Sequence, residues 1–171
     1  MKLAIAIAEA LKEHGLRHVF GVSGGANLHL IHAIYDTKIQ FVPTAHEQGA
    51  SFAADGYARV SGFGCALATS GPGATNLITG IATSYYDSIP VLYLTGNVAT
   101  DRFGSRLGVR QYGFQDTPIV EMVRGITKEA IQLAEPRMAI KILHALIKAA
   151  RAGRPGPVLF DVPDDLQRAQ I

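Results

Sequence analysis

The chain has 171 residues, of which 48% are hydrophobic and 18% charged, a composition that suits one well-packed globular domain and excludes a disordered segment. Sixteen basic and fourteen acidic side chains leave a net charge of +2, which is too small for a nucleic-acid-binding surface. Every apolar run is shorter than the roughly 20 residues that span a bilayer, so no membrane partner is expected.

The apolar pattern predicts helices and strands that alternate along the chain. Leu3, Ile7 and Leu11 share one face of a first helix, which Gly15 is expected to end. Beyond it the pattern predicts strands at 18–22, 39–44, 64–69, 91–95, 126–130 and 158–162, and helices at 28–35, 46–61, 74–86 and 136–152. Such alternation requires crossover connections and therefore parallel strands. With no repeat or linker to divide it, the chain is expected to form a single α/β domain over residues 1–171.

The N-terminal stretch and the single cysteine bear on the cellular location. Glu9, Lys12 and Glu13 interrupt the first apolar stretch too early for a secretory signal, so a cytoplasmic protein is expected. Cys65 lies in an apolar run, and one cysteine allows neither an internal disulfide nor a multi-cysteine metal site. We expect it to be a buried thiol of the core.

A carboxylate opens the helix predicted at 46–61. Glu47 follows His46 and is surrounded by small residues, including Gly49 and Ala50. Such a position predicts a tightly packed, weakly solvated carboxyl group with an unusual pKa, for which a cofactor nitrogen would be a suitable partner. The alternative is an idle acid that is merely favourable at the positive end of the helix dipole.

Two glycine-rich turns follow predicted strands. The run from Ser70 to Asn76 (Ser-Gly-Pro-Gly-Ala-Thr-Asn) leads into a helix, so its backbone amides approach any ligand at the carboxyl edge of the sheet. It lacks the Gly-Lys-Ser/Thr ending of a Walker loop and the spacing of a dinucleotide fingerprint. A strand-to-helix turn that simply needs Gly71 and Gly73 is compatible with ligand contact. The second turn holds Gly24 and Gly25, where a plain tight turn is an equal alternative.

These motifs, together with Gly-Arg-Pro-Gly-Pro-Val at 153–158, resemble the N-terminal pyrimidine-binding domain of thiamine diphosphate enzymes, and in particular the acetolactate synthase branch. The resemblance runs from Met1 to about Gln167. It implies a three-layer α/β fold, with an open, mostly parallel sheet of about six strands and helices on both faces. It also implies that Glu47 is catalytic, because the matching glutamate hydrogen-bonds N1′ of the aminopyrimidine ring and promotes loss of the thiazolium C2 proton. An apolar pocket suits this task, since water would weaken the preference for the imino tautomer of the aminopyrimidine ring.

The same resemblance implies further cofactor contacts on both turns. Thr69, Pro72 and Asn76 would lie around the pyrimidine ring and its pocket. Gly24 and Gly25 would approach the cofactor from the other turn. The family commonly has proline before this glycine pair, whereas this chain has a serine there.

The substrate pocket is implied by a short pair late in the chain. Phe114 and Gln115 match a Phe-Gln pair at the active site of acetolactate synthase-like enzymes, although Asp116 follows where that branch usually has glutamate. Arginines recur nearby at four-residue spacing, at positions 102, 106 and 110. They would attract an anionic 2-oxo acid, but glycines interrupt any helix that would align them, so a solvated charged stretch is favoured.

Two further patterns have an ordinary structural interpretation. His29 and His32 are three residues apart on a predicted helix but have no third ligand, so no metal site is expected in this chain. Ala50, Ala54 and Ala58 would allow another helix to approach closely, either inside the domain or at a subunit interface.

The chain has no Gly-Asp-Gly motif, which the family uses in a second domain to hold the diphosphate through Mg²⁺. The resemblance therefore implies half of an active site for a 2-oxo-acid-using enzyme, inactive without a diphosphate-binding domain or subunit; the family's central domain is absent as well. Thiamine diphosphate is the implied cofactor, FAD is permitted, and a homo-oligomer, dimer or tetramer, is expected. The alternatives are a regulatory or protein-interaction domain that retains the fold, and a free-standing nucleotide-binding protein.

Overall fold

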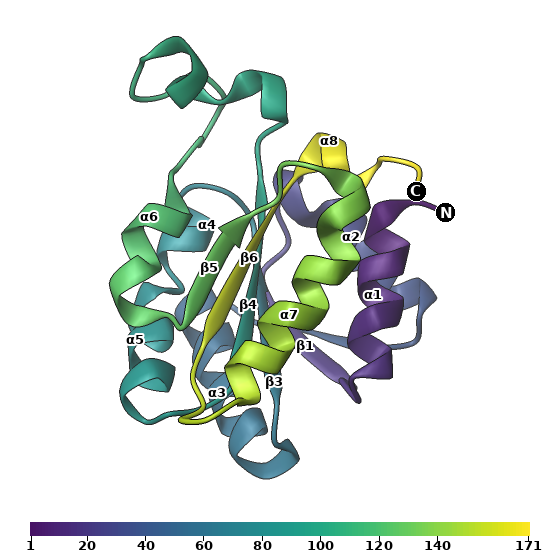
Figure 1. The fold of residues 1–171 in the computed structure, drawn as a ribbon, viewed down its shortest axis with the longest axis vertical. Helices are drawn as coiled ribbons and strands as arrows, with labels where there is room; N and C mark the ends of the chain where they lie inside the picture. The colour runs from purple at the N-terminus through teal and green to yellow at the C-terminus, as the bar shows by residue number, and fades with distance from the viewer.

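Six parallel strands form the centre of the molecule in the computed structural model, which describes all of residues 1–171 (Figure 1). The strands are β1 (His18–Gly21), β2 (Gln40–Pro43), β3 (Gly64–Ala68), β4 (Val91–Asn97), β5 (Glu129–Gln132) and β6 (Val158–Pro163). They make one open sheet in the order β2-β1-β3-β4-β6-β5, and every pairing is parallel. The predicted α/β class and the number of strands are confirmed.

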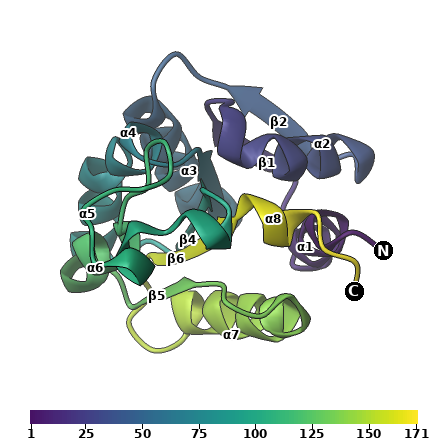
Figure 2. The same cartoon turned by 90° about the horizontal axis from the view of Figure 1, so that it is seen from above.

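Helices cover both faces of this sheet (Figures 1 and 2). One layer contains α1 (Leu3–Glu13), α2 (Leu28–Asp36) and α7 (Ala139–Arg151), and the other contains α3 (Glu47–Ser61), α5 (Ile78–Tyr86) and α6 (Ile119–Val123). Side chains alternate between the two cores along β3, so that Cys65 and Leu67 face the first layer while Ala66 and Ala68 face the second. Cys65 is fully buried, as predicted, and burial raises the pKa of its thiol.

Short helices account for most differences from the predicted boundaries. The helix predicted at 74–86 is two helices, α4 (Pro72–Thr75) and α5. The first of them begins at Pro72 rather than at residue 74, because proline suits the first turn of a helix. A 3-10 turn, Arg124–Ile126, precedes β5, which starts at Glu129, and another, Pro136–Met138, precedes α7. The four-residue helix α8 (Asp164–Gln167) has too few residues for an apolar period and was not predicted.

The chain begins and ends at the same place. Met1 and Ile171 exchange two hydrogen bonds, and Figure 1 shows the termini side by side near α1. None of the helices combines the length and the apolar character that crossing a membrane requires.

The alanines of α3 pack inside the domain. Ala50, Ala54 and Ala58 are all buried within this single chain. A Cβ atom added to Gly64 of β3 would lie 2.1 Å from the Ala54 carbonyl oxygen, so the helix backbone rests directly on the strand. The small residues therefore serve close helix-to-sheet packing, the first of the two alternatives raised by the sequence.

A pair of glycine substitutions tests this contact. Gly64→Ala is expected to lower the free energy of unfolding by about 2 kcal/mol, because the new methyl group meets rigid backbone. Gly56→Ala, on the exposed side of α3, meets nothing within 4 Å and is expected to raise it by about 0.5 kcal/mol. Urea denaturation of both variants measures the difference. Equal effects of the two substitutions would contradict the packing described here.

Two histidines join α1 to α7. His14 Nε2 and His144 Nδ1 are 2.7 Å apart, and Arg151 donates a hydrogen bond to the His14 carbonyl oxygen at 3.2 Å. Burial lowers the pKa of His14 below its ordinary value of 6.5; the charges of His144 and Arg151 lower it further, against an opposing effect of Glu13. The folded state therefore binds the His14 proton less tightly than the unfolded state does.

This shift makes the stability of the chain depend on pH. A lowered pKa contributes stability that is fully present above pH 6.5 and is lost as the pH falls through the folded-state pKa of His14. NMR titration should place the midpoint of His14 below 6.5, and His144→Gln should move it upward by removing a neighbouring charge. A midpoint at or above 6.5 in the wild-type chain would contradict this prediction.

Candidate functional site

The connections after β1 and β3 leave the sheet in opposite directions. β1 leads to α2 in one helical layer, whereas β3 leads to α4 and α5 in the other. Ligands of open α/β sheets bind where neighbouring strands diverge in this way, outside their carboxyl ends. β1 and β3 are paired neighbours, so the turn at 23–27 and the run at 69–76 meet at this edge.

Thr69 connects the two turns. Its Oγ1 accepts a hydrogen bond from the Ala26 backbone N–H at 3.1 Å. A Cβ atom on Gly24 would lie 2.5 Å from the Thr69 Cγ2 methyl, and one on Gly73 would lie 2.7 Å from it. Glycine is therefore needed at these two positions because a side chain would collide with Thr69. Backbone conformation is not the reason at Gly24, whose backbone is extended, at φ −161°.

Glu47 is the first residue of α3, with only 8% of its surface exposed. Its Oε2 accepts a hydrogen bond from the Asn76 side-chain amide at 3.0 Å, and this amide is the carboxylate's one hydrogen-bond partner. The other oxygen, Oε1, lies 3.4 Å from the place where a Cβ of Gly73 would be. His46 caps the helix, because its Nδ1 accepts a hydrogen bond from the Gln48 N–H at 3.1 Å. The carboxylate thus has spare capacity for a partner from outside this chain.

A cavity of about 330 Å³ lies beside Thr69. Gly25 and Thr69 line it from the two turns, and Phe114 and Gln115 line it from the chain that follows β4. A Cβ on Gly25 would meet nothing within 4 Å, so this residue borders open space. Glu47 does not line the cavity.

The structure therefore places the predicted site residues in two groups that share Thr69. One group surrounds the cavity, and the other holds the Glu47 carboxylate against Asn76 and Gly73. Pro72 belongs to neither set of contacts: it is exposed at the first turn of α4.

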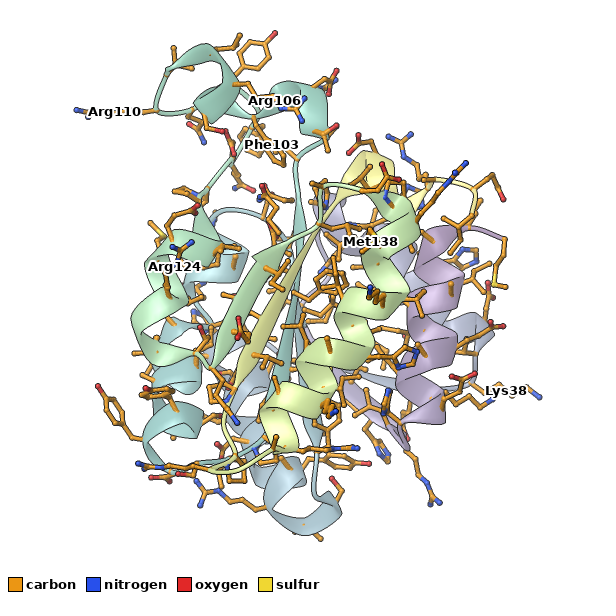
Figure 3. The ribbon with its side chains drawn as sticks, viewed as in Figure 1. Lys38, Phe103, Arg106, Arg110, Arg124 and Met138 are labelled. Carbon is orange, nitrogen blue, oxygen red and sulfur yellow. The ribbon has the colours of Figure 1, made fainter.

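Residues 98–118 form a projecting segment that stands above the carboxyl edge of the sheet (Figures 1 and 3). Gln115, near its end, has φ +62°, an uncommon and strained backbone conformation for a residue with a side chain. It packs against Gly71, where a Cβ would lie 2.6 Å from the Gln115 Cβ. Phe114 is 84% exposed at the rim of the cavity. The segment thus presents Gln115 inward and leaves Phe114 largely free.

The three arginines of this segment do not converge. Arg106 lies over the ring of Phe103, 5.8 Å from its centre, and Arg110 lies at the outer end of the segment (Figure 3). Arg102 lines the cavity. All three side chains are exposed on two short 3-10 turns, Thr100–Arg102 and Gly104–Leu107, and on the chain that follows, so Arg106 and Arg110 fit the interpretation as an exposed charged stretch while Arg102 also borders the cavity.

The two histidines of α2 have separate partners. His29 Nε2 lies 3.6 Å from an Asp164 carboxylate oxygen, and His32 Nε2 lies 3.9 Å from one of Asp36. The spacing on the helix therefore does not bring the two imidazoles to one point.

Sequence reasoning missed a buried polar network at the carboxyl ends of β4, β5 and β6. Asp161 is fully buried; its Oδ1 accepts a hydrogen bond from Thr95 Oγ1 at 2.6 Å, and its Oδ2 accepts one from each of the Asn97 and Gln132 amides at 2.8 Å. Burial raises the pKa of Asp161 in spite of these three hydrogen bonds. The available signal was an aspartate inside the otherwise apolar run 158–163.

Comparison with known proteins gives this geometry a family. The family model described as "Thiamine pyrophosphate enzyme, N-terminal TPP binding domain" matches residues 1–123. The chain belongs to this thiamine pyrophosphate enzyme family. Both turns, Glu47 and the projecting segment lie inside the matched range, whereas β5, α7, β6 and α8 lie beyond it.

Similar thiamine pyrophosphate enzyme relatives carry the name acetolactate synthase. The acetolactate synthase of Arthrospira platensis is 44% identical over 98% of this chain, and the probable acetolactate synthase large subunit of Methanocaldococcus jannaschii is 44% identical over 100% of it. The acetolactate synthase isozyme 2 large subunit of Escherichia coli is 40% identical over 95% of the chain. The chain spans only 28% to 29% of the length of these relatives.

Proposed function

We propose that this chain is the pyrimidine-binding half of a thiamine diphosphate-dependent enzyme that acts on 2-oxo acids in the manner of an acetolactate synthase. The observation that carries the proposal is the position of Glu47: a nearly buried carboxylate with one neutral partner, packed against Gly73 and Asn76 of the run that follows β3. Family membership and the names of the relatives support the same assignment.

The residues of the two turns, together with Glu47, suit the pyrimidine end of the cofactor. Glu47 Oε1 has no protein donor, so it is available to a ring nitrogen, while Asn76 fixes the other oxygen of the same carboxylate. Gly25 borders open space next to Thr69, which leaves room for a planar ring. Gly24 and Pro72 are assigned to the rim of this pyrimidine site on the strength of the sequence motif.

The diphosphate end is assigned to another part of the enzyme. No group of three or more His, Cys, Asp or Glu side chains in the chain could hold a metal ion. We therefore place Mg²⁺ on a domain outside this chain, and FAD use stays open. The chain's short span of its relatives leaves room for such domains.

When bound, thiamine diphosphate would supply a carbon nucleophile for the carbonyl of a 2-oxo acid and an electron sink for the loss of carbon dioxide. Glu47 holds and exchanges a proton at N1′ of the pyrimidine ring, and its burial prevents water from competing for that proton. Asn76 orients the carboxylate. Phe114 and Gln115 contact the substrate where the projecting segment meets the cavity, and Arg102 offsets the negative charge of the 2-oxo acid.

The assembled enzyme is proposed to be a cytoplasmic homo-oligomer, dimer or tetramer, in which a diphosphate-binding domain completes each site. Two of the relatives are named large subunits, which supports assembly with further chains. No observation favours the alternative of a purely regulatory domain. Carboligation is the proposed outcome because the relatives are named acetolactate synthases, with decarboxylation alone as the simpler outcome of the same residues.

Reconstitution tests the proposal. The 171-residue chain alone, supplied with pyruvate, thiamine diphosphate and Mg²⁺, is expected to show no turnover. The same chain joined to the diphosphate-binding domain of one of its relatives is expected to release carbon dioxide and form acetolactate. A reconstituted protein that lacks 2-oxo acid turnover would contradict the proposal. Calorimetric titration of the chain with nucleotides completes the test, since tight binding would favour the nucleotide-binding alternative.

A further inference from the structure

The last part of the chain touches both walls of the cavity. We name residues 161–168, which comprise the end of β6 and the helix α8, the α8 brace. It lies beyond residues 1–123, where the family model matches, yet Asp164 and Arg168 line the cavity and are paired at 3.0 Å. In Figure 1 it sits at the carboxyl edge of the sheet, below the projecting segment.

One end of the brace holds the glycine turn after β1. The side-chain amide of Gln167 is fully buried and donates hydrogen bonds to two carbonyl oxygens, that of Ala26 at 2.7 Å and that of Val162 at 2.8 Å. Ala26 lines the cavity next to Gly25. This amide therefore ties the wall that contains Gly25 to the last strand of the sheet.

The brace also holds the root of the projecting segment at two points. Both carboxylate oxygens of Asp165 are used on Thr100: Oδ1 accepts from the backbone N–H at 3.0 Å, and Oδ2 accepts from the hydroxyl at 2.7 Å. Asp161 holds Asn97 at 2.8 Å, and the Asn97 Oδ1 in turn accepts a hydrogen bond from the Val98 N–H at 2.8 Å. Arg102 reaches the cavity two residues after Thr100, and its carbonyl oxygen accepts a hydrogen bond from the Gly113 N–H at 2.8 Å, which links the Phe114-Gln115 pair to this root.

We propose that the α8 brace is a positioning element that sets how the projecting segment stands against the glycine turn, with Asp165 and Gln167 as its positioning residues. Gln167 fixes one wall, Asp165 fixes the other, and both belong to one helical turn that follows directly from a fully buried strand. The expected effect of the α8 brace on substrate binding rests on the proposed function. Its expected effect on the position of the projecting segment does not.

Asp165 offers a substitution pair that separates positioning from general stability. Asp165→Ala removes both acceptors, whereas Asp165→Asn keeps an oxygen for the Thr100 N–H and a donor for the Thr100 hydroxyl. Asp101→Ala is the matched control, because this exposed carboxylate lies on the same 3-10 turn as Thr100.

Amide hydrogen exchange of the 171-residue chain measures the result. Asp165→Ala is expected to speed exchange roughly tenfold in the projecting segment, with α7 unchanged, as loss of a charged hydrogen bond at the root predicts. Asp165→Asn and Asp101→Ala are expected to exchange as the wild type does. Wild-type exchange in Asp165→Ala, or equal acceleration in α7, would overturn the proposal. Gln167→Met should likewise speed exchange at residues 24–27, and no change there would overturn its part in the brace.

Kinetics of the assembled enzyme provide the second readout. Asp165→Ala is expected to raise the KM for pyruvate roughly tenfold and to change kcat less. The substitution displaces the residues that contact the substrate and leaves Glu47 in place. Asp165→Asn should restore the wild-type KM. An unchanged KM in Asp165→Ala would overturn the inference. A wild-type enzyme without 2-oxo acid turnover would overturn the proposed function instead, and the exchange experiment would still decide whether the brace positions the segment.

Discussion

Replacement of Glu47 by glutamine is expected to lower the turnover of the assembled enzyme by roughly 10²-fold to 10⁴-fold, the range for loss of a group that transfers a proton. Glutamine has nearly the same shape and still offers an oxygen to the Asn76 amide, so the 3.0 Å hydrogen bond can persist. It cannot exchange a proton with a ring nitrogen. Steady-state kinetics with pyruvate at saturating thiamine diphosphate and Mg²⁺ measure the effect.

A matched control for this substitution is Glu9→Gln, which neutralises an exposed acid on α1, in the other helical layer. It is expected to leave turnover unchanged. Glu47→Gln should unfold at the same denaturant concentration as the wild type, because it buries no new group and retains its hydrogen bond. Wild-type turnover in Glu47→Gln would remove Glu47 from the mechanism.

Asp161→Ala is expected to lower the free energy of unfolding by about 3 to 5 kcal/mol. The carboxylate accepts hydrogen bonds from Thr95, Asn97 and Gln132, and its removal leaves buried donors that each cost about 1 to 3 kcal/mol when unpaired. Asp161→Asn should cost much less, because its oxygen still accepts from the two amides and the Thr95 hydroxyl can turn to accept from its nitrogen. Urea denaturation of both variants is the measurement, and equal losses would contradict the network.

The same aspartate makes a contribution that depends on pH. Burial raises the pKa of Asp161 above its ordinary value of 3.8, so the folded state binds this proton more tightly than the unfolded state. The associated stability is fully present below pH 3.8 and is lost as the pH rises through the folded-state pKa. The free energy of unfolding of the wild type, relative to that of Asp161→Asn, is therefore expected to fall as the pH rises from 3.8 through the folded-state pKa of Asp161. A constant or rising difference would show that the carboxylate is not destabilised by burial.

The sheet and its helices could be predicted because their signals are local. Apolar runs mark the strands, and Gly15 ends α1 in the left-handed backbone region, at φ +85°. The placement of Glu47 at the first turn of α3 also follows from local pattern, as does the position of the two glycine turns after strands. Parallel topology then places both turns at one edge of the sheet.

Contacts between distant residues could not be predicted in the same way. The hydrogen bond from Asn76 to Glu47 depends on how α3 and α4 pack, and the network of Asp161 joins three strands that are far apart in sequence. The helix α8 is too short for a periodic signal, although it holds Thr100 and Ala26. The sequence likewise holds no signal that Glu47 lies outside the cavity. This arrangement depends on Thr69, which packs against both turns and lines the cavity, whereas Glu47 does not line it.

Exchange of the thiazolium C2 proton reports on the action of Glu47 at the pyrimidine ring of a bound cofactor. NMR of thiamine diphosphate bound to the assembled enzyme in deuterated water measures this rate without any substrate. We expect Glu47→Gln to slow the exchange by roughly 10²-fold or more relative to the wild type, with the cofactor still bound. Equal exchange rates in the two proteins would contradict the role proposed for Glu47.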